Sequence, residues 1–218
     1  MTDRETYEAN GVKLYVEDDM IIRSIPKNGP FEPETTAWIF DKISEKTFVD
    51  VGVSTGWFSC AVAARGTPVF GFEPLPNSYR RCIENLELND LTMTLVNAAV
   101  SDFIGTASFQ YNSRLPLTSG ASLLKNIGGN RASMEVEVVR LDDFDIPSIG
   151  VMKVDVEGNE MAVLRGAKQT IAKHRPHMVL EANNGDFMAK LAAWMEENDY
   201  TWVQADRRNM LCTPKPLS

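Results

Sequence analysis

The fold is decided by the stretch Phe48-Val49-Asp50-Val51-Gly52-Val53-Ser54-Thr55-Gly56-Trp57. A short apolar run over 47–51 leads into a turn, and the apolar residues of 57–64 then recur at helical spacing. A strand, a tight turn and a helix in direct succession are typical of the start of a βαβ unit. The glycines Gly52 and Gly56 bracket the turn, where unusual backbone angles and the close approach of a ligand favour this residue.

The same alternation continues along the chain on both sides of this unit. Strands are predicted at 69–72, 93–96, 151–154 and 177–180, and helices at 34–43, 78–88, 160–172 and 187–197. Short apolar strands that alternate with amphipathic helices indicate a mostly parallel sheet with both faces covered. The last two strands, 201–204 and 210–212, are too close for a helical crossover and should pair antiparallel. We therefore predict a single doubly wound α/β domain over residues 1–218, with a reversed strand near its end.

Two segments depart from this alternation. Residues 12–25 read as two short strands around the acidic turn Glu17–Asp19, which predicts a β-hairpin within an N-terminal extension, residues 1–30. A middle insertion, residues 103–149, contains predicted strands at 109–111 and 135–139 around a stretch rich in serine, glycine and asparagine. Loops of that length inside a domain are usually functional or disordered, so the insertion is either a flap over a site or a surface loop.

Composition excludes several classes of protein. The chain has 218 residues, of which 44% are apolar and 24% charged, and this is the usage of a soluble globular domain. Its formal net charge of −8 disfavours general nucleic-acid binding. An N-terminus too polar for a secretory signal and the lack of a long apolar run predict a cytoplasmic protein without a membrane segment. The three cysteines, Cys60, Cys82 and Cys212, suggest neither a disulfide framework nor a zinc site.

Acidic and small side chains follow the predicted strands at their carboxyl ends. Ligands of such sheets bind beyond these ends, so the side chains there should meet in one site. A carboxylate after the second strand, Glu73, can accept both hydroxyls of a ribose. Ala98 and Ala99 after the third strand leave room for an adenine, whose exocyclic amine Asp102 could bind. Carboxylates in the segment 155–160 after the fourth strand are costly unless they bind a ligand or are well solvated.

The first turn does not fit a dinucleotide site. The fingerprint G-x-G-x-x-G fails because Ser54 and Trp57 occupy two of its three glycine positions. Asp50, at the end of the first strand of this unit, suits a cation better than a pyrophosphate. A ligand that carries an ammonium and a sulfonium therefore fits better than a nicotinamide cofactor, and an oxidoreductase on the same architecture is disfavoured.

At this point the sequence resembles a known family. The ordered segments FVDVGVSTGWFS, FGFEP, NAAVSD and MKVDVEGNEMAVLRGA are similar to the FkbM-type methyltransferases, a branch of the class I methyltransferases. The resemblance extends from about residue 29 to 181. It implies a seven-stranded sheet with the last strand reversed and S-adenosylmethionine as cofactor. It also implies methyl transfer to a hydroxyl of a sugar, glycan, polyketide or similar small molecule.

The resemblance also implies roles for individual residues. The methionine part of the cofactor would lie on Asp50, Gly52 and Gly56. The family more often has an asparagine at position 54, so Ser54 keeps a hydrogen-bonding group with a shorter reach. Further implied contacts are the ribose site (Glu73 and Pro74), the adenine site (Ala98 and Ala99), and a flap over cofactor and acceptor (Ser119 and Ser122).

Deprotonation of an alcohol requires a general base within hydrogen-bond reach. We rank Asp155 first because it ends the fourth strand beside the expected methyl position; it would also contact the cofactor. Glu157 comes second, and Glu181, at the end of the fifth strand, third. His174 and His177 precede the fifth strand and so lie at the opposite end of the sheet from the cofactor.

Two alternatives remain open. The three carboxylates Asp155, Glu157 and Glu181 could hold a divalent metal for methylation of a catechol-like or sugar diol, although we predict no metal. The acidic run 141–145 could also suggest a metal, but it lies at the wrong end of a strand. A module that binds an adenosine ligand without catalysis is the other alternative. The sequence indicates neither the acceptor nor the oligomeric state.

Overall fold

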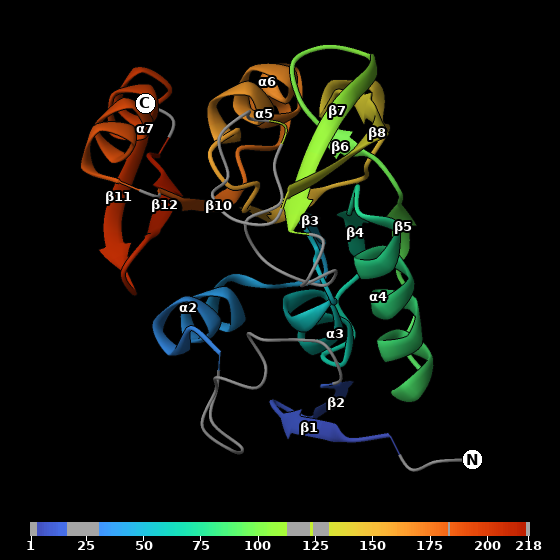
Figure 1. The fold of residues 1–218 in the computed structure, drawn as a ribbon. Coiled ribbons are helices and arrows are strands. Elements are labelled where there is room, and N and C mark those ends of the chain that lie inside the picture. Colours follow the sequence, from blue (N-terminus) through green and yellow to red (C-terminus); the bar gives the residue numbers. More distant parts are fainter. Residues whose placement is uncertain (1–3, 17–30, 113–122, 124–130, 183, 217–218) are drawn as a thin grey trace.

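The structure is a computed structural model, and it describes residues 4–16, 31–112, 123, 131–182 and 184–216. Figure 1 shows its helices and strands. In chain order they are β1 (Thr6–Ala9), β2 (Val12–Tyr15), α2 (Pro33–Lys42), β3 (Thr47–Val51), α3 (Trp57–Ala63), β4 (Val69–Phe72), α4 (Pro76–Leu88), β5 (Thr94–Val96), β6 (Ala99–Val100), β7 (Gly105–Asn112), β8 (Arg131–Val139), the 3₁₀ helix η1 (Leu141–Asp143), β9 (Ile149–Val154), α5 (Glu160–Gly166), α6 (Lys168–His174), β10 (His177–Glu181), α7 (Gly185–Glu197), β11 (Tyr200–Ala205) and β12 (Asn209–Pro214).

A seven-stranded sheet with the strand order β11-β12-β10-β9-β3-β4-β5 forms the centre of the molecule. The five strands β10, β9, β3, β4 and β5 run parallel to one another. β12 is inserted between β10 and β11 and runs antiparallel to both. The predicted α/β fold with a mostly parallel sheet is confirmed.

Helices cover both faces of this sheet, as expected for buried parallel strands. Successive side chains of β3 point to opposite faces, so Val49 joins one core and Phe48 the other. The core around Val49 includes apolar residues of α5, α6 and α7, and the core around Phe48 includes those of α2, α3 and α4. Among the described residues, no helix has both the length and the apolar composition that crossing a bilayer requires.

The described N-terminal residues contain a β-hairpin. Residues 12–15 form the predicted strand, and this strand, β2, pairs antiparallel with β1 upstream of it. The turn is Asn10-Gly11, and both residues have positive φ angles (54° and 82°), as the favoured two-residue hairpin turns require. We missed this Asn-Gly signal and chose the acidic turn at Glu17–Asp19, which lies outside the described residues together with the rest of 17–30.

The middle insertion supplies β7 and β8 of a second, smaller sheet with the order β6-β8-β7, and β6 precedes the insertion. Both predicted strands lie within longer ones, because β7 and β8 pair antiparallel over their whole length. Two cavity-facing residues, Phe109 of β7 and Leu123, come from this insertion. Ser119 and Ser122, the predicted flap contacts, lie outside the described residues.

The predicted helix over 160–172 is broken in two at Ala167. A Cβ on Gly166 would lie 1.9 Å from the backbone oxygen of Ser101, so α5 ends against the backbone near β6. The Asp142 carboxylate accepts hydrogen bonds from the backbone N–H groups of Gln169 and Thr170 at 3.1 and 2.8 Å. These contacts cap a new helix start, and neither is visible in the periodicity of the sequence.

Candidate active site

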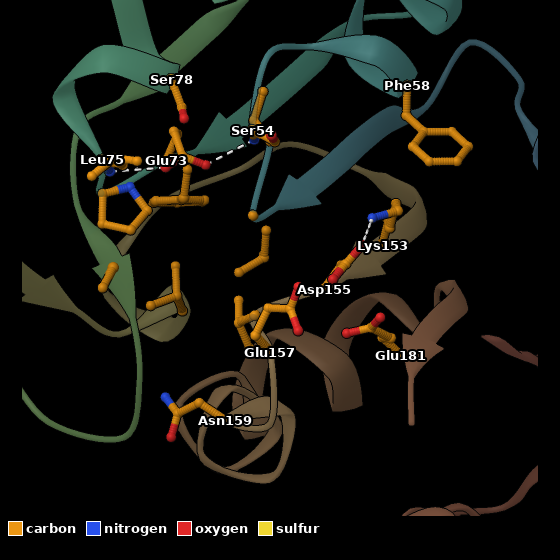
Figure 2. A pocket seen from close by; sticks show the side chains of 18 of the residues that line it. Ser54, Phe58, Glu73, Leu75, Ser78, Lys153, Asp155, Glu157, Asn159 and Glu181 are labelled. Atoms are coloured by element: carbon orange, nitrogen blue, oxygen red, sulfur yellow. Dashed lines mark hydrogen bonds and ion pairs between the residues drawn. The ribbon is translucent and has the colours of Figure 1, made fainter. Parts of the chain in front are cut away.

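A cavity of about 370 Å³ opens at the carboxyl ends of β3, β4, β9 and β10 (Figure 2). Its volume lies in the usual range for small-molecule sites, and its position is where doubly wound sheets bind their ligands. Nine of the predicted site residues line it: Gly52, Ser54, Glu73, Pro74, Ala98, Ala99, Asp155, Glu157 and Glu181. The topology therefore brings together side chains that are up to 129 positions apart in the chain (Gly52 and Glu181).

Glu73 is fixed at one side of the cavity by its own backbone surroundings. Its Oε2 accepts a hydrogen bond from the N–H of Ser54 at 2.7 Å, and its Oε1 accepts one from the N–H of Leu75 at 2.8 Å (Figure 2). Burial raises the pKa of Glu73 to about 7, although these two hydrogen bonds oppose the shift. Each carboxylate oxygen keeps a further lone pair, so Glu73 can still accept two hydrogen bonds from a ligand.

The two glycines of the first turn have different roles. Both have positive φ angles, 90° at Gly52 and 93° at Gly56. A Cβ on Gly52 would lie 1.9 Å from the backbone oxygen of Asp155, so this glycine brings two turns together at the cavity. A Cβ on Gly56 would lie 2.8 Å from Cys82 Sγ, and Gly56 does not line the cavity. Gly56 thus allows α3 to pack closely against α4.

Asp50 also does not line the cavity, in contrast to its predicted role as a ligand contact. Its side chain is buried beneath the residues that line the cavity, which we call the cavity floor, and its Oδ2 accepts a hydrogen bond from the hydroxyl of Ser59 at 2.6 Å. Burial raises the pKa of Asp50 to about 6, with Lys153 as the main opposing charge. Asp102 is likewise not among the lining residues, because it pairs with Arg165 at 2.7 Å.

Two further carboxylates of the cavity, those of Asp155 and Glu181, form a row in which each lies against a side-chain cation. Asp155 Oδ2 lies 2.8 Å from Lys153 Nζ, and Glu181 Oε1 lies 3.0 Å from Arg208 Nη1. Lys153 lowers the pKa of Asp155 against the effect of burial. Burial raises the pKa of Glu181 to about 9, and the negative charges of Asp155 and Glu157 add to the shift. The pKa values of Asp155 and Glu181 are therefore shifted in opposite directions, and Asp155 ionises more readily than Glu181.

The loop after β9 is shaped by a buried glutamate. Glu160 is fully buried, and its Oε1 accepts hydrogen bonds from the N–H groups of Val156 and Gly158, both at 3.1 Å. Between them Glu157 has a φ of 55°, which is uncommon outside glycine. Ser54, on the opposite turn, has a φ of 54°. Such backbone conformations concentrate at functional sites, and both of these residues line the cavity.

Comparison with known proteins agrees with this geometry. A family model described as "Methyltransferase FkbM domain" matches residues 50–201, which is more than half of the chain. The chain belongs to the FkbM methyltransferase family. The resemblance stated from the sequence segments is thereby confirmed.

Relatives and neighbouring structures point the same way. Over 123 residues the chain is 29% identical to the hexuronic acid methyltransferase AglP of Haloferax volcanii, covering 54% of this chain and 48% of that protein. It is 26% identical to the methyltransferase sdnD of Sordaria araneosa over 160 residues, covering 58% of this chain and 62% of that protein. The chain thus spans about half to three fifths of the length of these curated relatives.

Among solved structures, an FkbM methyltransferase from Methylobacillus flagellatus aligns with a TM-score of 0.57 at 18% identity. The alignment covers 78% of this chain and 44% of that one. The tRNA (uracil-54, C5)-methyltransferase of Pyrococcus abyssi, solved with S-adenosyl-L-homocysteine, aligns with a TM-score of 0.54 at 12% identity, covering 97% and 44%. At these identities the two structures support the fold of this FkbM methyltransferase and nothing finer.

Several cavity residues of this member of the FkbM family were missed by the sequence reasoning. Among them are Phe31, Glu32, Phe58, Lys153 and Arg208. Lys153 gave the clearest available signal, since a lysine in the middle of a buried strand requires a counter-charge. Trp57 is buried against Tyr7 and Phe31 and also lines the cavity.

The histidines lie away from this site, as predicted. His177 begins β10, at the end opposite Glu181, and packs edge-on against Trp38 with ring centroids 5.7 Å apart. His174 is the last residue of α6. Burial lowers the pKa of both imidazoles, and neither lines the cavity.

The three carboxylates also satisfy the distance requirement for a metal. Oxygens of Asp155, Glu157 and Glu181 all lie within 4.8 Å of one another. Two of the three, however, already face a side-chain cation, Lys153 or Arg208. A divalent ion would have to compete with both, so this donor set fits a charge-compensated carboxylate row better than a metal centre.

Proposed function

We propose that this protein is an S-adenosylmethionine-dependent O-methyltransferase that acts on a hydroxyl of a sugar, a glycan or a similar small molecule. The observation that carries the proposal is the cavity itself. It combines a buried carboxylate with spare acceptor capacity, Glu73, and an ionised carboxylate, Asp155, at the carboxyl end of a methyltransferase sheet. The resemblance to a hexuronic acid methyltransferase supports a sugar-like acceptor.

The residues of the cavity fit this cofactor. Glu73 has lone pairs left for the two ribose hydroxyls, and the small Ala98 and Ala99 leave space for the adenine. The absence of a side chain at Gly52 lets this turn lie close to the backbone of Asp155 at the cavity. Asp155 presents a negative charge toward the cationic end of the cofactor. When bound, S-adenosylmethionine supplies a methyl group activated by its sulfonium.

The protein then has two tasks, alignment and proton removal. Alignment of an acceptor oxygen with the methyl carbon can contribute roughly 7–11 kcal/mol to catalysis. The hydroxyl becomes strongly acidic as its oxygen gains the methyl group, so a carboxylate such as Asp155 or Glu157 suffices to receive the proton. Burial raises the pKa of Glu181, so this carboxyl takes up a proton more readily than Asp155 and is better suited to donate a hydrogen bond to the acceptor.

Calorimetry with S-adenosylmethionine and S-adenosylhomocysteine tests the cofactor assignment. We expect both to bind, and no heat with either ligand would overturn the proposal. A panel of sugars, including hexuronic acids, is then incubated with isotopically labelled cofactor and the products are analysed by mass spectrometry. Cofactor binding without label transfer to any acceptor would favour the module that binds without catalysis. Loss of transfer in a strong chelator, restored by a divalent ion, would favour the metal-dependent alternative.

A further inference from the structure

Lys153 is a buried cation in the middle of the sheet. It lies on β9, between β3 and β10, and its side chain is 3% exposed. Side chains alternate along a strand, so Lys153 and Asp155 point to the same face. The parallel register places Asp50 of β3 beside Lys153, and Val154 pairs with Leu180 of β10, one residue before Glu181. The strand geometry alone therefore groups these charges on one face.

The surroundings of Lys153 are negative on several sides. Its Nζ is 2.8 Å from Asp155 Oδ2, and Asp50 and Glu32 act on it from β3 and from the segment before α2. From α3 the ring of Phe58 faces the ammonium, with its centroid 5.0 Å away (Figure 2). Glu181 and Arg208 complete the row on the other side of Asp155. The ammonium thus has an aromatic face on one side and carboxylates on the others.

Asp155 differs from the neighbouring carboxylates because of this contact. Asp50, Glu73, Glu160 and Glu181 all have pKa values raised by burial. The Asp155 side chain is 27% exposed, and its pKa is lowered because Lys153 lies against it. Without the lysine, Asp155 and Glu181 would be two adjacent carboxyl groups with Arg208 as the nearest cation, and one of them would take up a proton readily.

We propose that Lys153 is a positioning residue for methyl transfer, which holds the Asp155 carboxylate ionised and directed into the cavity where the cationic end of the cofactor meets the acceptor hydroxyl. The inference rests on the proposed function. It assigns to the lysine of the segment MKVDVEG a role that acts entirely through Asp155, two residues further along the strand. The same lysine also offsets Asp50 below the cavity floor.

The test is a double-mutant cycle with Lys153→Met, Asp155→Asn and the double variant, measured as the affinity for S-adenosylmethionine from pH 6 to 9. We expect Lys153→Met to bind at least tenfold more weakly than the wild type at pH 6 and to approach wild-type affinity by pH 9. Removal of the lysine raises the pKa of Asp155, and higher pH restores the carboxylate. Asp155→Asn should show a deficit that does not vary with pH, because it has no proton to lose.

The double variant keeps the test informative if Lys153→Met fails to fold. Lys153→Met alone leaves Asp50 and Asp155 without their neighbouring cation, whereas the double variant removes a charge of each sign. If Lys153 acts through Asp155, the double variant should bind within about threefold of Asp155→Asn. A further tenfold loss in the double variant, or a deficit in Lys153→Met that is the same at every pH, would overturn the inference. Lys173→Met, at an exposed position of α6, is the control and should match the wild type throughout.

The outcomes separate the two proposals. If the wild type binds neither S-adenosylmethionine nor S-adenosylhomocysteine, the proposed function fails before the cycle begins. If the wild type binds and the cycle is additive, the proposed function stands and the role of Lys153 is wrong.

Discussion

Replacement of Glu73 by glutamine tests the cofactor site with the smallest change in shape. In the wild type, one carboxylate oxygen faces the N–H of Ser54 and the other faces the N–H of Leu75, at 2.7 and 2.8 Å. A glutamine has one oxygen, so its NH₂ group must face one of the two donors. Because the side chain is only 6% exposed, water cannot replace the lost acceptor. The geometry therefore predicts one lost charge-assisted hydrogen bond and one unsatisfied buried N–H.

The expected cost can be estimated from these contacts. An unsatisfied buried donor costs about 2 kcal/mol, which corresponds to a decrease in Tm of roughly 4–8 °C for a chain of this size. Loss of the ionised acceptor for a ribose hydroxyl should weaken binding by about 1.5–3 kcal/mol, or roughly 10- to 150-fold. Differential scanning calorimetry and titration calorimetry with S-adenosylhomocysteine measure the two effects.

A pH series adds a second criterion. The pKa of Glu73 is about 7, so the wild-type carboxylate is lost as pH falls below that value and binding should weaken. Glu73→Gln cannot titrate and should lack this component. The matched control is Glu87→Gln on the exposed side of α4, which should change stability by less than about 0.5 kcal/mol. Wild-type Tm and wild-type affinity in Glu73→Gln would refute the reasoning.

Three further predictions follow from other contacts. Gly52→Ala should abolish cofactor binding and lower Tm strongly in calorimetry, because its Cβ would lie 1.9 Å from the backbone oxygen of Asp155 at a φ of 90°; a stable, binding variant would contradict this. Asp142→Ala should lower stability by about 1 kcal/mol in urea unfolding, since it removes the cap of α6, while binding stays unchanged. Glu160→Gln can keep both hydrogen bonds to Oε1, and burial raises the pKa of Glu160 to about 7. Its Tm relative to the wild type should therefore rise as pH increases from about 4 to 7, where the buried glutamate ionises, and a flat difference would exclude that shift.

Much of the fold could be predicted from the sequence because its signals are local. The alternation of short apolar strands with amphipathic helices is visible within each window, and it predicted the parallel strands and the two helical layers. Errors arose where a contact from elsewhere in the chain decided the outcome. The break between α5 and α6 depends on the backbone of Ser101 and on the carboxylate of Asp142, both distant in sequence. The hairpin turn at Asn10-Gly11 was a local signal that we overlooked.

By itself, the sequence determined which residues lie at the carboxyl ends of the strands, because strand periodicity and the parallel direction follow from local patterns. Glu73, Asp155 and Glu181 could therefore be predicted to share one site. Only the tertiary structure decided their charge states and contacts. The burial of Asp50 below the cavity floor, the ion pair of Lys153 with Asp155 and the raised pKa of Glu181 depend on strand register, on burial and on neighbours from other elements. Electrostatic energies vary with distance and solvent exposure, and the linear order of residues specifies neither.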